Sequence, residues 1–85
     1  MEKDEIKEKI KTIAIQYIKT QEIADDTPLT SRPYSAGALS VAAIFICIEK
    51  EFGVDLNKVF DHAIDYSVRS IADAVSVCIH DHNVL

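Results

Sequence analysis

An almost uninterrupted apolar run occupies the middle of the chain. Between Leu39 and Ile48 the only polar residue is Ser40. The run is far shorter than the ~20 apolar residues that a membrane-spanning helix needs, so it predicts no membrane insertion. Gly53 follows shortly afterwards, and glycine commonly ends a helix. We therefore predict a helix over residues 38–52 that is apolar on nearly every side.

A helix that is apolar all round has to be covered all round, and a chain of 85 residues has few other helices to cover it. One interpretation is that part of this helix meets a partner protein or a second copy of the chain. The other is that Ala42 and Ala43, whose side chains are small, face water at little cost. The sequence leaves both interpretations open.

Length and charge narrow the possible functions. A chain of 85 residues has room for one core, so we expect a single domain over residues 1–85. Its 14 acidic and 9 basic side chains leave a net charge of −5. Binding of nucleic acid or of an anionic membrane surface needs a basic face, and the sequence offers none. An acidic chain fits a protein partner with a basic docking patch.

The N-terminus and the cysteines favour a cytoplasmic protein. Residues 1–5 carry acids where a secretory signal would be apolar. Cys47 and Cys78 are far apart and lack metal-binding or redox spacing, which favours thiols over a disulfide.

Apolar spacing predicts a further long helix over residues 4–19, with its lysines on a solvated face. The next segment, residues 25–37, has the prolines and small polar residues of a long connection. Leu29 and Tyr34 are its only large apolar residues. We expect both side chains to anchor this connection to the core.

Two more helices are predicted in the C-terminal part. A short one covers residues 58–64. The last one begins near Ser67 or Ser70, where residues 70–73 resemble a capping box, and its apolar stripe extends to Ile79.

The predicted fold class is therefore all-α. Three longer helices and one short helix form a small bundle with a long loop between the first two, and no segment predicts a strand. We expect residues 1–4 and 80–85 to fray, because they lie outside the apolar stripes.

No residue cluster predicts an enzyme. His80 and His82 cannot share one face of a helix, and no further ligand stands at metal-binding spacing. Asp61 and His62 resemble a fragment of a hydrolase motif that lacks its other ligands. Nucleophile elbows and phosphate-binding glycine loops are also missing. We expect neither catalytic residues nor a metal site.

The segment that closes the apolar helix resembles a family motif. Residues 49–56 read Glu-Lys-Glu-Phe-Gly-Val-Asp-Leu, which is similar to the segment that ends the second helix of the acyl carrier protein family. Residues 25–29 resemble part of that family's first loop, and residues 67–75 resemble the beginning of its last helix. The resemblance covers about residues 6–79. It implies a small four-helix acyl-carrier-like bundle.

The attachment site of the family's prosthetic group is altered in this chain. Counted back without gaps from the closing segment, the family's Asp-Ser-Leu motif falls on Gly37-Ala38-Leu39. The resemblance thus places 4′-phosphopantetheine at Ala38, which has no hydroxyl to form a phosphodiester. We expect no cofactor at Ala38. Ser40 and Ser35 are alternative attachment positions if a neighbouring serine is used.

The surface that the resemblance assigns to partner enzymes is altered as well. Related carriers offer acidic residues along the second helix to basic patches on their enzymes. Here acids survive only at Glu49 and Glu51. We expect a mixed contact, with Leu39, Ala42 and Phe45 at its apolar centre and these acids at its rim.

Three functions follow as alternatives. The first is a divergent acyl carrier-like module that acts with enzymes of fatty-acid, polyketide or specialised-metabolite biosynthesis without being loaded at Ala38. The second is a working carrier loaded at Ser40 or Ser35. The third is a structural or regulatory interaction protein, a homodimer through the second helix, with no link to acyl chemistry.

Overall fold

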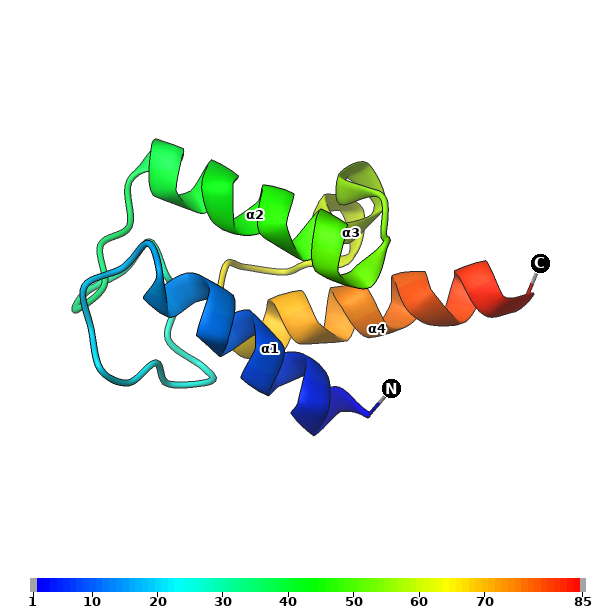
Figure 1. Cartoon of the computed structure of the whole chain (residues 1–85), viewed down its shortest axis with the longest axis horizontal. Coiled ribbons are helices and arrows are strands. Elements are labelled where there is room, and N and C mark those ends of the chain that lie inside the picture. Colours follow the sequence, from blue (N-terminus) through cyan, green and yellow to red (C-terminus); the bar gives the residue numbers. More distant parts are fainter. Residues whose placement is uncertain (1, 85) are drawn as a thin grey trace.

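A computed structural model describes the backbone of residues 2–84 and the side chains of residues 2–79. Within this part of the chain all regular structure is helical, which confirms the predicted all-α fold and its arrangement as a small four-helix bundle. Figure 1 shows α2 lying above α1 and α4, with the long connection between α1 and α2 wrapping one end of the bundle. The helices are α1 (Lys3–Ile15), α2 (Ala38–Phe52), α3 (Leu56–His62) and α4 (Val68–Val84).

The helices extend into both segments that we expected to fray. The Ile6 amide donates to the Glu2 carbonyl at 3.0 Å, so α1 begins within the first residues. The backbone of α4 remains helical to Val84. The predicted absence of a metal site at His80 and His82 concerns side chains outside the described residues.

The first connection is longer than predicted, because α1 ends at Ile15 rather than near Lys19. The amides of Tyr17 and Ile18 both donate to the Ala14 carbonyl, at 3.0 and 2.9 Å, and this tight turn closes the helix. Ile18 then turns into the core, as does Ile23. Burial of these two apolar side chains stabilises the fold.

The connection is anchored as predicted. Leu29 is 1% exposed, and its amide donates to the Tyr66 carbonyl at 2.9 Å. Tyr34 is partly buried against the core, and its hydroxyl accepts a hydrogen bond from the Ala24 amide at 2.6 Å. The connection therefore has an apolar anchor at Leu29 and a polar one at Tyr34.

Side-chain caps set the beginnings of α3 and α4. The Asp55 carboxylate accepts from the Asn57 amide at 2.8 Å, so α3 begins at Leu56, earlier than predicted. The Ser67 hydroxyl accepts from the Ser70 amide at 3.2 Å, so Ser67 caps α4. The capping box predicted at residues 70–73 is wrong, because the Ser70 hydroxyl instead accepts from two amides of the preceding connection.

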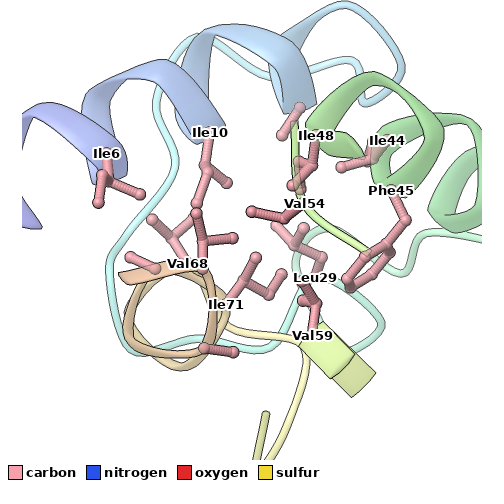
Figure 2. Packing of buried hydrophobic residues seen from close by; sticks show 14 of the residues in the cluster. Ile6, Ile10, Leu29, Ile44, Phe45, Ile48, Val54, Val59, Val68 and Ile71 are labelled. Carbon is pink, nitrogen blue, oxygen red and sulfur yellow. The ribbon is translucent and has the colours of Figure 1, made fainter. Parts of the chain in front are cut away.

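The core lies between all four helices and the long connection. Figure 2 shows aliphatic side chains from α1, α2, α3 and α4 pointing toward one another. Helix α1 packs extensively on α4, whereas α2 rests on α1 and α3 over a smaller area. One side of α2 is therefore left open. The core residues that are least exposed include Ile6, Ile10, Leu29, Ile44, Phe45, Ile48, Val59, Val68, Ile71 and Val75.

Candidate functional site

The beginning of α2 lies at the surface. Gly37 is the residue before the helix and has an extended backbone. Ala38, where the resemblance places the prosthetic group, is the first residue of α2 and is exposed. Its side chain is a methyl group on the rim of an open hollow. The local geometry thus exposes this position without offering an oxygen there.

The hollow beside Ala38 is an apolar groove of about 410 Å³. It lies beside the N-terminal half of α2. Its other lining residues come from the α1–α2 connection, from α3 and from the α3–α4 connection, which Figure 1 shows in yellow below α2. Apolar atoms make up most of its surface, so it excludes water from whatever apolar group enters it. The residues that line this groove are Thr30, Ala36, Ala38, Val41, Ala42, Phe45, Phe60 and Tyr66.

Three aromatic rings form the deep side of the groove. The centroid of the Phe45 ring lies 4.7 Å from that of Phe60 and 5.8 Å from that of Tyr66, in an edge-to-face arrangement. Phe60 and Tyr66 keep part of their surface exposed. Phe60 of α3 and Tyr66 of the α3–α4 connection both pack on Phe45, which is itself a core residue. The groove is therefore in direct contact with the core.

The prediction that Phe45 presents its side chain to a partner is wrong. Phe45 is 1% exposed, and in Figure 2 its ring points from α2 toward Val59 and Leu29. The physical reason is that α3 and the long connection cover this side of α2. Of the two small residues, Ala42 is exposed and Ala43 is half-buried. Leu39 is 89% exposed, as its predicted role requires.

A second hollow, of about 500 Å³, continues the groove. The two share Phe60 and Tyr66, so the two hollows are neighbours. Ile64 lines the second hollow and is 94% exposed. A large aliphatic side chain so exposed beside aromatic rings is typical of a contact surface.

The two predicted rim acids differ in their surroundings. Both Glu49 and Glu51 are exposed near the C-terminal end of α2. The Glu51 carboxylate, however, lies 3.2 Å from the Lys9 ammonium of α1. Its charge is therefore partly neutralised within the molecule, and Glu49 is the stronger candidate for attracting a basic partner.

The alternative attachment residues are placed differently from each other. Ser35 is exposed in the connection just before α2 and has a left-handed backbone, with φ of 47°. Ser40 is half-buried within the first turns of α2. Of the two hydroxyl groups, that of Ser35 is more accessible to another protein.

Sequence reasoning missed the contribution of α3 and its following connection. Phe60 lies on α3, whereas Ile64 lies just beyond it, because α3 ends at His62 rather than at Ile64 as predicted. The Val59 side chain already supplies the core contact of α3. Apolar residues beyond the core stripe of a short helix are therefore the signal that could have found this surface.

Other classes of site find little support in the described part of the chain. Among these residues no group of three potential ligands could hold a metal ion. None of the described helices has the length and apolarity required to cross a membrane. The Cys47 thiol is half-buried and lies 3.3 Å from the Tyr17 hydroxyl.

Comparisons of the chain with protein-family models, with curated proteins and with solved structures find no significant match.

Proposed function

We propose that this protein is a divergent acyl carrier-like interaction module that is not loaded at the usual position. The proposal rests on the sequence resemblance over about residues 6–79. Two structural features support it: three longer helices with one short helix, and a long first connection anchored by Leu29. The module acts by binding enzymes of fatty-acid, polyketide or specialised-metabolite biosynthesis, and it performs no catalysis itself.

One observation supports the proposal that the protein carries no 4′-phosphopantetheine at the usual position. Ala38 occupies the exposed first position of α2, at the rim of the apolar groove, and presents only a methyl group. A phosphodiester to 4′-phosphopantetheine needs a side-chain oxygen at the attachment position. The groove beside Ala38 therefore acts through noncovalent contacts with a partner.

The test is the intact mass after incubation with coenzyme A and a broad-specificity phosphopantetheinyl transferase. We expect no mass gain for the natural chain. The double variant Gly37→Asp, Ala38→Ser restores the motif at an exposed helix start and should gain the mass of one arm. Neither position is in the core, and a side chain at Gly37 meets no atom within 4 Å, so the variant should fold.

Each alternative result has a definite meaning. A mass gain on the natural chain would establish the working carrier, and the variants Ser35→Ala and Ser40→Ala would show which hydroxyl is used. If the double variant folds but gains no arm, the resemblance to acyl carriers does not extend to recognition by the transferase, and the proposed family role is wrong.

A further inference from the structure

Three neighbouring hollows share lining residues, and we call this row of hollows the trough. The groove beside α2 and the second hollow share Phe60 and Tyr66. The second hollow in turn shares Ile64 and Asp65 with a third hollow of about 220 Å³. The α2 end of the trough is apolar, whereas polar and charged side chains line the third hollow at the beginning of α4.

The polar end of the trough keeps one unbalanced negative charge. Arg69 forms two contacts with the Asp26 carboxylate, and the Asp73 carboxylate lies 3.1 Å from the Lys3 ammonium. His62 also lines this end. Asp65 has no cationic partner among the residues whose side chains are described.

Asp65 remains ionised at neutral pH. Its carboxylate accepts a hydrogen bond from the Ser67 amide at 2.9 Å. Hydrogen bonds from the Ser67 side chain and backbone hold the pKa of the Asp65 carboxyl below its ordinary value of 3.8. An ionised carboxylate at the end of an apolar trough complements a single cationic group.

We propose that the trough binds an amphipathic helix of a partner protein, with aliphatic side chains against Phe60 and Ile64 and a lysine or arginine facing Asp65. The inference rests on the proposed role as an interaction module and names the chemistry of its partner. The described residues contain no strand whose edge could pair with an extended peptide. A helix laid into a groove presents several apolar side chains in one row, with a charged side chain beside them.

A second copy of the chain fits the trough poorly. A twofold interface places the same patch of both copies together, which would bring two Asp65 carboxylates into one interface. The net charge of −5 adds to this repulsion. A zwitterionic lipid surface carries no net positive charge to attract Asp65, and an anionic lipid surface repels this carboxylate.

The test uses a synthetic, fluorescently labelled peptide of about 18 residues. Leucines at i, i+3, i+4 and i+7 form its apolar face, and lysines border one side. Binding to the full chain is measured by fluorescence anisotropy at low and high salt. We expect saturable binding that weakens with salt, and much weaker binding of the same peptide with glutamates in place of lysines.

Variants of the trough distinguish the contributions of its apolar and its charged side chains to peptide binding. Ile64→Ser should weaken binding roughly tenfold, whereas Ile15→Ser changes a partly exposed isoleucine outside the trough and should leave binding unchanged. Asp65→Asn keeps an oxygen for the Ser67 amide but removes the charge, so binding should weaken about threefold or more and lose salt dependence. Asp61→Asn, an exposed carboxylate on α3, is its matched control.

The inference is wrong if the lysine peptide does not bind, if both peptides bind equally, or if the control variants weaken binding as much as the trough variants. It is also wrong if saturable binding is seen only to phosphatidylcholine vesicles, or if Ile64→Ser abolishes self-association instead of peptide binding. Loading of the Gly37→Asp, Ala38→Ser variant reports on the proposed function independently. That variant can gain its arm while the peptide fails to bind.

Discussion

At the scale of single residues, Asp25 connects more of the molecule than any position that the sequence singled out. Its carboxylate lies 2.6 Å from the Lys11 ammonium and 3.1 Å from that of Lys7. Its carbonyl accepts from the Arg69 amide at 2.8 Å. The lysines interpreted as a solvated face of α1 therefore hold the long connection, because Asp25 lies on that connection next to the beginning of α4.

We predict that Asp25→Asn destabilises the protein by about 1 kcal/mol at neutral pH, or roughly 4–8 °C in Tm. Hydrogen bonds from Lys11 and then Lys7 hold the pKa of the Asp25 carboxyl below its ordinary value of 3.8. A carboxyl with a lowered folded pKa contributes stability above its unfolded pKa and loses it as pH falls through the folded pKa. Urea unfolding of the two proteins from pH 7 downward measures this.

The stability difference between the natural chain and Asp25→Asn should shrink as pH falls below 3.8, and it should vanish below the lowered folded pKa, where the carboxyl is protonated in both states. Asp26→Asn is the matched control, because the side chain of Asp26 is 73% exposed and contacts only Arg69. Its effect should be smaller. A constant difference across the whole pH range would contradict the role of the Asp25 charge.

At the scale of elements, the hydrogen bonds of the α3–α4 connection fix the second half of the trough. The amides of Ile64 and Asp65 donate to the Ser70 hydroxyl at 2.8 and 3.1 Å. The Ser67 hydroxyl caps α4 and is itself buried. This connection places Tyr66 against Phe45, so the capping of one helix orients a wall of the groove beside another.

We predict that Ser67→Ala destabilises the protein by about 1 kcal/mol, since α4 loses its side-chain cap. Chemical unfolding followed by circular dichroism measures this loss. Ser67→Thr retains a hydroxyl and should recover part of it. If Ser67→Ala and Ser67→Thr are equally destabilised, the cap is not the source of the effect.

At the scale of the whole molecule, the open side of α2 raises the question of self-association. The apolar run of α2 would favour it, but the trough ends in an unbalanced carboxylate and the chain has a net charge of −5. Ala42 and Ala43 lie at or near the surface with little apolar area. The large apolar side chains that α2 exposes are Leu39 and Ile46.

We predict that the chain sediments as a monomer at micromolar concentration. Leu39→Ser, which changes a residue that is 89% exposed, should leave the sedimentation coefficient unchanged. Phe45→Glu is unsuitable for this test, because a charge at a buried position would unfold the protein. A dimer that Leu39→Ser dissociates would instead support the homodimer through α2.

Local patterns in the sequence predicted the class of fold well. Apolar spacing identified four helices, and Gly53 ends α2 with the left-handed backbone that favours glycine, with φ of 65°. Leu29 and Tyr34 anchor the long connection as their apolar character in a polar segment predicted. These features depend on neighbours within a few residues, so the chain alone reveals them.

The covered side of each helix depended on packing between distant segments. Phe45 belongs to a run with no polar face, so its periodicity could not tell core from surface. It is buried because Phe60 and Tyr66 lie against it. In the same way Ile18 lies beyond the end of α1 and is buried in the core. Lys7 and Lys11 of α1 pair with Asp25 on the connection. Helix formation is local, whereas burial and charge pairing are decided where elements far apart in the sequence meet.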